Sequence, residues 1–537
     1  MMKRRDFLRA GALTGAAALI PDASSAALEN APPAVHVDEF DLDEKTIADL
    51  RRDMMSGKRT AQSITRDYLE RIETMDRKGP ALRAVIELNP DAMAIAKSLD
   101  DERTSRGMRG PMHGIPVLIK DNIDTHDRMM TTAGSYALEG SIPLQDAHVA
   151  RRLRDAGAVI LGKTNLSEWA NFRSTHSSSG WSGRGGQTKN PYVLDRSPCG
   201  SSSGSGAAVA ANFCAAAVGT ETDGSITCPA SINGIVGIKP TIGLVSRAGI
   251  VPIAHSQDTA GPMTRTVTDA AILLTALAGV DTRDSATARS RGKAKPDYTR
   301  FLDARALKGA RIGVPRDKFY GYSDATDKLA DEAIALMKSQ GAIIVDPANI
   351  PTAGKFDDTE FDVLLYEFKA DLNKYLASLG SGARVKTLAD VIAYNERDKA
   401  REMPYFGQEI MLQAQKKGPL TEKKYVDALA RNHRMSRTEG IDAVMTKHRL
   451  DALIAPVTGP AWPIDLLNGD HFVGGSTTPA AVAGYPNISV PMGDVFGLPV
   501  GLSFFGRAWS EDKLIALAFS YEQASRHRRA PKFLTTI

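Results

Sequence analysis

The chain has 537 residues, of which 42% are hydrophobic and 24% charged, and its formal net charge is +4. A chain of this size can bury a large core, and a length-based expectation of about three domains is weak because large α/β folds often form one domain. The small net charge does not indicate nucleic-acid binding. The 10 histidines are scattered, without a zinc-binding pattern or a phosphate-binding loop, so we expect no metal and no cofactor.

The N-terminus has the pattern of an export signal. Residues 3–26 read KRRDFLRAGALTGAAALIPDASSA, in which the arginine pair Arg4 and Arg5 precedes a short apolar stretch and then small residues. The apolar stretch, residues 10–20, is shorter than the roughly 20 residues needed to span a bilayer. The pattern predicts that residues 1–26 are a twin-arginine (Tat) signal peptide, handled by the Tat machinery and cleaved after about Ala26. We therefore expect a periplasmic or secreted protein without stable membrane association.

The remaining residues, 27–537, show no domain boundary and alternate between helical and strand patterns. Apolar residues at helical spacing predict helices at residues 46–56, 60–75, 147–156 and 268–278. Short apolar runs that end in Gly, Pro, Asn or Asp predict buried strands at GIPVLIKD, AVILGKTN, ARIGVP, AIIVDP and DALIAP. This alternation favours an α/β fold with a large mixed β-sheet core covered by helices on both faces. Residues 301–440 are more charged, and we expect them to form a variable helical cover over the rest of the fold.

Two blocks carry the candidate chemistry. Lys120 ends the apolar strand-like run of residues 115–119, where a charged ammonium is costly to desolvate, so we expect a neutral and basic amine. Residues 199–241 form a run rich in serine and glycine that holds Ser201 and Ser225. A serine is a weak nucleophile until a base takes its proton, and lysine is one of the bases that can do so. The run also contains helix-like AAVAAN and strand-like GIVGIKP, which argue against a flexible linker.

These residues identify a resemblance to the amidase signature hydrolases. The family pattern G-G-S-S-G-G-S, then G-T-D-T-G-G-S-I-R-x-P, then G-x-K-P-T is approximated by residues 199–205, 219–229 and 237–241. The resemblance extends from about Phe40 to about Ser525. Within the family, strings such as GKTNLSEWANFR and GWSGRGGQTKNPY are most similar to the bacterial peptide amidases, which remove the C-terminal amide of peptides.

The resemblance implies a role for each residue of the two blocks. Ser225 is implied to be the nucleophile, Ser201 the bridging serine on a cis peptide after Gly200, and Lys120 the base that accepts the relayed proton. The N–H groups of Thr222, Asp223, Gly224 and Ser225 are expected to form the oxyanion hole.

The chain departs from the family pattern at Cys199, Ser203, Glu221, Asp223 and Thr227. A carboxylate at position 223 would oppose the developing negative charge if it pointed inward, so we expect it to face away while its N–H donates. The odd number of cysteines argues against a disulfide framework, and we interpret Cys199 and Cys228 as small packing residues.

Other side chains have more than one interpretation. Trp181, Tyr192 and Trp462 are candidates for lining a peptide pocket, although aromatic residues more often belong to the core. Arg265 and Asp258 recur in the family pattern, and we expect a structural pair.

The sequence thus predicts a metal-independent amide hydrolase that acts on the C-terminal amide of peptides and releases ammonia through an acyl-enzyme. A general aliphatic or aryl amidase remains an alternative. So does the amidase subunit of a tRNA-dependent amidotransferase, against which the export signal argues. A third alternative is a catalytically silent periplasmic peptide-binding protein. The expected partner is a small-molecule or peptide amide, with no nucleic acid.

Overall fold

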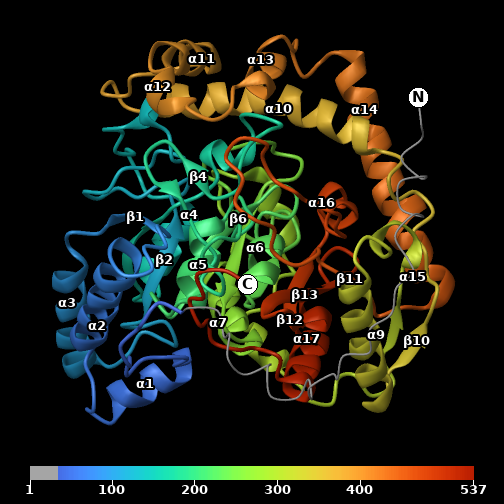
Figure 1. Cartoon of the computed structure of the whole chain (residues 1–537), viewed down its shortest axis with the longest axis horizontal. Coiled ribbons are helices and arrows are strands. Elements are labelled where there is room, and N and C mark those ends of the chain that lie inside the picture. The colour runs from blue at the N-terminus through green and yellow to red at the C-terminus, as the bar shows by residue number, and fades with distance from the viewer. Residues whose placement is uncertain (1–33) are drawn as a thin grey trace, which may run out of the picture.

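The computed structural model describes residues 34–537, so the predicted signal peptide of residues 1–26 lies outside the described residues. In this part of the chain the core is an 11-stranded mixed sheet with strand order β1-β3-β2-β6-β8-β7-β12-β13-β11-β9-β10 (Figure 1). The expected α/β fold is confirmed. The strands are β1 (Val85–Leu88), β2 (Pro116–Lys120), β3 (Val159–Thr164), β6 (Ala216–Glu221), β7 (Val236–Lys239), β8 (Thr259–Thr264), β9 (Arg311–Gly313), β10 (Ile343–Val345), β11 (Ala452–Pro456), β12 (Asn487–Val495) and β13 (Leu498–Phe505).

The strands next to the site are parallel and wholly buried. β2 pairs in parallel with β3 and β6, and every residue of these three strands is buried. A strand buried on both faces reads as a continuous apolar run, which is why the sequence indicated β2 and β3 so clearly. The remaining pairs around β8, β7, β12 and β13 are antiparallel, which makes the sheet mixed.

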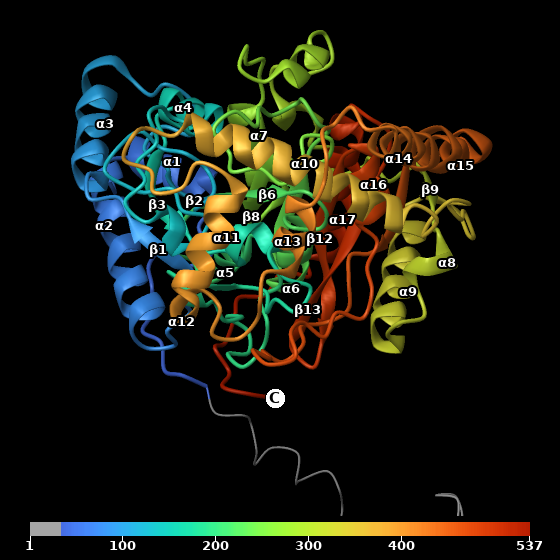
Figure 2. The same ribbon diagram turned by 90° about the horizontal axis from the view of Figure 1, so that it is seen from above.

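Helices cover both faces of this sheet. On one face α5 packs on β2, β3, β6 and β8, its neighbour α6 packs on β7, β12 and β13, and the two helices contact each other. On the other face α4, α7, α17 and α9 contact one another in that order and cover the strands from β3 across the sheet to β11. Figure 2, seen from above, shows the layers around the central strands. These helices are α4 (His148–Asp155), α5 (Ser203–Ala210), α6 (Thr227–Ile232), α7 (Val267–Leu277), α9 (Asp324–Ser339) and α17 (Glu511–Ser525).

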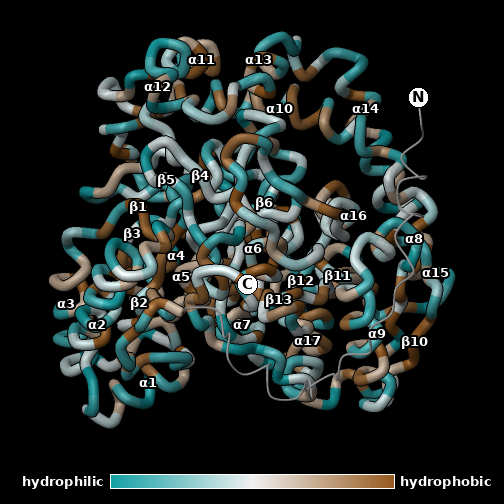
Figure 3. The backbone as a smooth tube through the Cα atoms, in the orientation of Figure 1, coloured by the Kyte–Doolittle hydropathy of each residue, from teal (hydrophilic) through white to brown (hydrophobic). Residues whose placement is uncertain are grey.

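The N-terminal helices begin at capping boxes. Thr46 starts α1 (Ile47–Met55) by accepting from the N–H of Asp49, whose carboxylate accepts from the N–H of Thr46. Thr60 and Ser63 do the same for α2 (Ala61–Ile72). Such reciprocal bonds satisfy amide groups that the first helical turn leaves without partners. In Figure 3 the helix α2 shows both hydrophilic and hydrophobic colours, as expected of a helix with one buried face. The next helix, α3 (Ala92–Arg106), buries Ala92, Ala96 and Leu99.

Residues 301–440 are not helical throughout, which refines the expectation of a helical cover. Their first part adds β9 and β10 to the edge of the sheet. Their second part forms the helical layer at the top of Figure 1. The helices of this layer are α10 (Asp357–Ser378), α11 (Leu388–Arg397), α12 (Lys399–Glu402), α13 (Glu409–Gln415) and α14 (Lys423–His433). The short helices α8 (Arg316–Phe319), α15 (Asp442–His448) and α16 (Thr478–Ala483) lie outside it. The strands β4 (Trp181–Ser182) and β5 (Gly186–Gln187) form a separate small hairpin.

Within residues 34–537, none of the helices has the length and apolar character that crossing a bilayer requires.

Candidate active site

The site lies where the parallel strands β2 and β6 end. Ile119 pairs with Val218, so Lys120, the last residue of β2, lies beside the end of β6 at Thr220. The turn that carries Ser225 follows β6 directly, and Ser201 precedes α5. In open α/β sheets the carboxyl ends of the strands are the usual place for a ligand site, because loops from neighbouring strands meet there.

Lys120 is fully buried and makes short contacts to hydroxyl groups. Its Nζ lies 2.8 Å from Ser201 Oγ and 2.8 Å from Thr220 Oγ1, and 3.3 Å from the Thr220 carbonyl. Burial lowers the pKa of Lys120 to about 7, against the opposing effect of Asp258 and Glu221. At neutral pH a large fraction of this amine is therefore neutral and able to accept a proton.

Ser201 is held by its backbone. The Gly200–Ser201 peptide bond is cis, as the resemblance implied, and the Ser201 carbonyl accepts from the N–H of Ser167. α5 starts two residues later and packs closely on its neighbours at Gly204. A Cβ there would lie 2.2 Å from the Ala84 carbonyl oxygen, so only glycine fits.

Ser225 lies beside Ser201 in a turn whose N–H groups are free. Ser202 donates its N–H to the Ser225 carbonyl at 3.2 Å, which joins the two serine segments. Among residues 34–537, no hydrogen bond is made by Ser225 Oγ or by the N–H groups of Asp223, Gly224 and Ser225. Gly224 has a φ of +75°, a conformation that favours glycine. Free N–H groups in a tight turn can bind an oxyanion.

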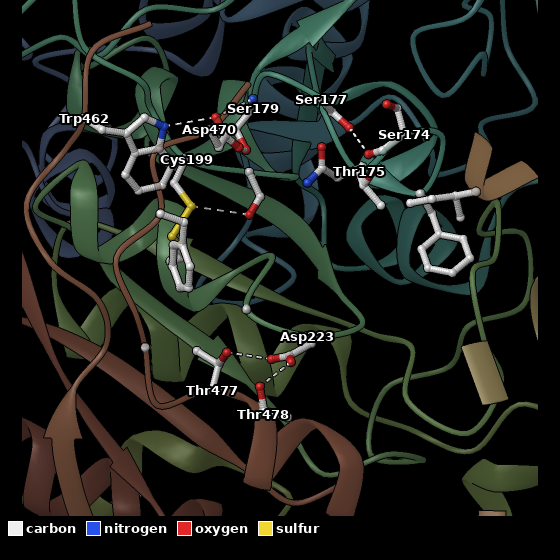
Figure 4. Close-up of a pocket in the computed structure, with 18 of the residues that line it drawn as sticks. Ser174, Thr175, Ser177, Ser179, Cys199, Asp223, Trp462, Asp470, Thr477 and Thr478 are labelled. Atoms are coloured by element: carbon white, nitrogen blue, oxygen red, sulfur yellow. Dashed lines mark hydrogen bonds between the residues drawn. A yellow bond between two sulfur atoms is a disulfide. The ribbon is translucent and has the colours of Figure 1, made fainter. Parts of the chain in front are cut away.

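The Asp223 carboxylate is held by two threonines that follow it far along the chain. Its two oxygens accept from the hydroxyl of Thr477 at 2.6 Å and from that of Thr478 at 2.7 Å (Figure 4). The carboxylate thus has its own donors, and the side chain lines the cavity described below. Its orientation relative to a bound oxyanion stays a prediction.

The other two residues before the turn are fixed as well. Glu221 accepts from the N–H groups of Ile226 and Thr227, and Thr222 donates its hydroxyl to Asp258 at 2.6 Å. The substituted positions of the family pattern, Glu221 and Thr227, therefore contact each other. The side chains of Glu221, Thr222 and Asp223 are therefore each hydrogen-bonded to a different segment, which fixes the turn that follows β6.

A cavity of about 550 Å³ opens onto the two serine segments. Gly200 and Gly224 belong to its lining, so it reaches the backbone beside both serines. Phe361 from α10 and Ile410 from α13 line it from the helical layer. Hydroxyl side chains make one wall, which is formed by Ser174, Thr175, Ser177 and Ser179 (Figure 4). A cavity of this size suits a ligand larger than a simple amide.

The prediction for the cysteines was wrong. Cys199 and Cys228 form a disulfide with a Cα–Cα distance of 6.1 Å, and Cys214 is the buried free thiol. The odd count misled because one cysteine belongs to the core. The disulfide joins a residue two positions before Ser201 to one three positions after Ser225, and both cysteines line the cavity.

The expected pair of Arg265 and Asp258 was also wrong. Arg265 donates to the carbonyls of Val209, Cys214 and Lys45, and it makes no hydrogen bond to Asp258. Asp258 instead accepts from Thr222 and from two N–H groups of the preceding loop.

Of the three aromatic candidates, only Trp462 lines the cavity. Trp181 packs edge-on against Phe406, with the Arg173 guanidinium over its ring. Tyr192 donates its hydroxyl to the Arg529 carbonyl.

Several residues of the site could not be found from the sequence. Thr220, which contacts Lys120, lies in the same motif block as Ser225 and was the one residue with a local signal. Asp470, Thr477 and Thr478 reach the cavity from the loop before α16 and from the start of that helix, more than 240 residues beyond Ser225, where no local pattern marks them.

Comparisons with known proteins agree with this geometry. The family described as Amidase matches residues 63–515. The chain is 44% identical over 505 residues to a probable amidase of Arabidopsis thaliana, covering 92% of this chain and 93% of the relative. It is 36% identical to a subunit of the glutamyl-tRNA(Gln) amidotransferase of Microcystis aeruginosa, over 91% of this chain and 99% of that protein.

A solved structure extends the likeness to the fold. The X-ray structure of the native peptide amidase from Stenotrophomonas maltophilia is 52% identical, has a TM-score of 0.89, and is matched over 92% of this chain and 100% of that chain. The expected resemblance is confirmed at the level of the family. The fold, the buried Lys120–Ser201 contact and these matches together show that the chain belongs to the amidase signature family and is an amidase.

Proposed function

We propose that the chain removes the C-terminal amide of peptides, with Ser225 as nucleophile, Ser201 as the bridging serine and Lys120 as the base. The observation that carries the proposal is the contact of a fully buried lysine with a serine hydroxyl, Nζ to Oγ at 2.8 Å. With a pKa of about 7, roughly half of this buried amine is neutral at pH 7 and can take a proton, whereas an ordinary surface lysine is almost fully protonated.

The reaction follows from this arrangement. Ser225 Oγ attacks the amide carbonyl while its proton passes to Ser201, whose own proton passes to Lys120 Nζ. The carbonyl oxygen becomes an oxyanion, stabilised by the N–H groups of residues 222–225. The C–N bond breaks as the proton returns from Lys120 through Ser201 to the leaving nitrogen, and ammonia departs. Water then attacks the acyl-enzyme with the same proton path and releases the acid.

Of the two hydrogen bonds that the proton transfer needs, the described residues form one and lack the other. Lys120 and Ser201 are in contact, whereas Ser225 Oγ has no hydrogen-bond partner among the described residues. The proposal requires Ser225 Oγ to approach Ser201 Oγ when substrate is bound, and catalytic hydrogen bonds commonly tighten at that stage. The bond from Ser202 N–H to the Ser225 carbonyl already keeps the two segments adjacent.

The choice of a peptide amide rests on two supports. The cavity of about 550 Å³ exceeds what a small amide needs. The Stenotrophomonas maltophilia enzyme with the same fold is a peptide amidase, and it is 52% identical to this chain.

The test is ammonia release from a dipeptide amide by purified protein. Ser225→Ala is expected to abolish it, whereas Ser231→Ala, a buried serine of α6 that accepts from the Gly501 N–H, is the matched control and should retain it. A serine-reactive probe should label Ser225 in the wild-type chain. Activity of Ser225→Ala equal to wild type would overturn the assignment.

A panel of peptide, aliphatic and aryl amides then separates the peptide amidase from a general amidase. The free-acid products are identified by mass. Preference for peptide amides supports the proposal, and equal turnover of all three classes favours the general amidase.

A second candidate is the amidase subunit of an amidotransferase. Its support is the 36% identity to the Microcystis aeruginosa protein over almost all of that protein. Such a subunit is expected to copurify with a partner that binds tRNA, so a chain that purifies alone and hydrolyses dipeptide amides would argue against it.

We also propose that the protein is exported by the Tat machinery to the periplasm or beyond. The support is the sequence of residues 1–26, with Arg4 and Arg5 before a short apolar stretch. Replacing both arginines with lysine should leave uncleaved precursor inside the cell. Unchanged export of that variant would contradict the proposal.

A further inference from the structure

The charged residues of the cavity all have one sign. Asp223 and Asp470 line it, whereas no Lys, Arg or His among residues 34–537 does. A further acid stands behind its wall, since Glu409 accepts from the hydroxyl groups of Ser174 and Thr175, which line the cavity. A concave site lined by one sign of charge attracts ligands of the opposite sign and repels those of the same sign.

Asp470 is built into the wall by three hydrogen bonds. Its Oδ1 accepts from the Ser179 N–H at 3.0 Å and from Trp462 Nε1 at 3.0 Å, and its Oδ2 accepts from the Ser179 hydroxyl (Figure 4). A carboxylate oxygen can accept about two hydrogen bonds, so Oδ2 keeps capacity for another donor. These partners fix the carboxylate in place without neutralising its charge.

An aromatic surface adjoins this carboxylate. Trp462 and Phe472 stack edge to face with ring centroids 5.9 Å apart, and both line the cavity. Phe472 is 54% exposed, so this pair lies where the cavity meets solvent. Aromatic faces pack against the methylene groups of lysine and arginine, and they also attract the cationic end.

We propose that this carboxylate and aromatic pair form a subsite for a long cationic side chain, so that the enzyme prefers peptide amides containing lysine or arginine. The methylene stem lies against Trp462 and Phe472, and the ammonium or guanidinium group meets Asp470. Acidic side chains are disfavoured by both Asp470 and Asp223. The inference rests on the proposed peptide amidase function and specifies its substrate class.

The test compares N-acetylated dipeptide amides that differ at one position, placed in turn at each of the two residues. Lysine is compared with norleucine, which has the same stem without the charge, and glutamate with glutamine. At the position that reaches Asp470 we expect kcat/KM to be about ten-fold higher for lysine than for norleucine, and lower for glutamate than for glutamine. Added salt should reduce the lysine preference of the wild-type enzyme, because it screens a partly exposed pair.

Asp470→Asn should bring the lysine-to-norleucine ratio of kcat/KM close to one. Asp371→Asn, which removes a carboxylate from a separate cavity, is the matched control and should keep the preference. Equal kcat/KM for lysine and norleucine in the wild-type enzyme at both positions would overturn the inference, as would a lysine preference that survives in Asp470→Asn. Neither result would contradict the proposed function. The proposed function is contradicted if the wild-type enzyme does not hydrolyse neutral peptide amides, or if Ser225→Ala does hydrolyse them.

Discussion

Lys120 shows how one buried side chain acquires a chemical property. The apolar strand β2 carries it to a position with no exposed surface, where its hydrogen-bond partners among the described residues are hydroxyl and carbonyl oxygens of Ser201 and Thr220. Desolvation lowers the pKa of its amine to about 7, because the charges of Asp258 and Glu221 only partly offset the loss of water. The same residue at the surface would be protonated at neutral pH and useless as a base.

The first prediction concerns pH. Because the neutral amine is the base, kcat/KM for a peptide amide should be low below pH 7, rise through an inflection at about pH 7 and level off above it. Asp258 raises the pKa of Lys120, so Asp258→Asn should move the inflection to lower pH. Lys120→Arg, which stays charged at every accessible pH, should lower kcat by about 10²–10⁴-fold throughout. Initial rates of ammonia release across roughly two pH units on either side of the inflection measure this, and a flat wild-type profile would count against the lysine.

At the scale of elements, the two serine segments depend on each other. Ser201 sits before α5 and Ser225 before α6, and these helices pack together on the sheet. The disulfide from Cys199 to Cys228 and the bond from Ser202 to Ser225 join the segments across the cavity wall. The relative position of the two hydroxyls is therefore set by links between elements.

The second prediction removes the disulfide. In Cys199→Ala/Cys228→Ala we expect kcat to fall more than KM changes, because the serine segments lose a link while the Asp470 wall is untouched. The free energy of unfolding should fall by about 3–4 kcal/mol, the usual contribution of a crosslink that closes a loop of this length. Steady-state kinetics and thermal unfolding measure both effects.

Cys214→Ala is the control for this pair, since it changes a buried free thiol without touching the crosslink. It should leave kcat unchanged. If the double variant also kept wild-type kcat, the disulfide would have no part in positioning the serines.

At the scale of the whole molecule, residues distant in sequence are joined by buried polar contacts. Arg265 is 2% exposed, and its guanidinium donates to carbonyls of Lys45, Val209 and Cys214. These carbonyls precede α1, lie in α5 and precede β6, so one side chain connects the N-terminal helices to the core. Burial raises the pKa of Asp269 to about 6, and the nearby charge of Arg265 opposes that rise.

The third prediction tests this connection. Arg265→Met keeps the volume of the stem but removes the hydrogen bonds of the guanidinium to the carbonyls of Lys45, Val209 and Cys214, so the free energy of unfolding should fall by about 3 kcal/mol. Denaturant unfolding measures the loss. Arg305→Met, at a side chain 90% exposed, should change it by less than about 0.5 kcal/mol. Equal stability of both variants would mean that Arg265 does not hold these segments together.

The sequence by itself determined the local elements and the family. Apolar runs ended by Gly, Pro, Asn or Asp predicted the strands β2, β3, β9, β10 and β11, because such a run is a local pattern. The expected burial was wrong for β10, which lies at the edge of the sheet with Ile343 exposed. The motif blocks likewise placed Lys120, Ser201 and Ser225 as the candidate residues, since these blocks are local patterns. The structure then brought Lys120 and Ser201 into contact.

Only the tertiary structure decided which distant residues come into contact around the site. The Cys199–Cys228 disulfide, the carbonyl partners of Arg265, and the placement of Thr477, Thr478 and Asp470 around the cavity have no local pattern, because each depends on segments that pack together from distant parts of the chain. A residue's own neighbours in sequence fix its backbone and its burial tendency. Its chemical partner is fixed by the fold, since hydrogen bonds and crosslinks form between whatever groups the packed core brings within reach.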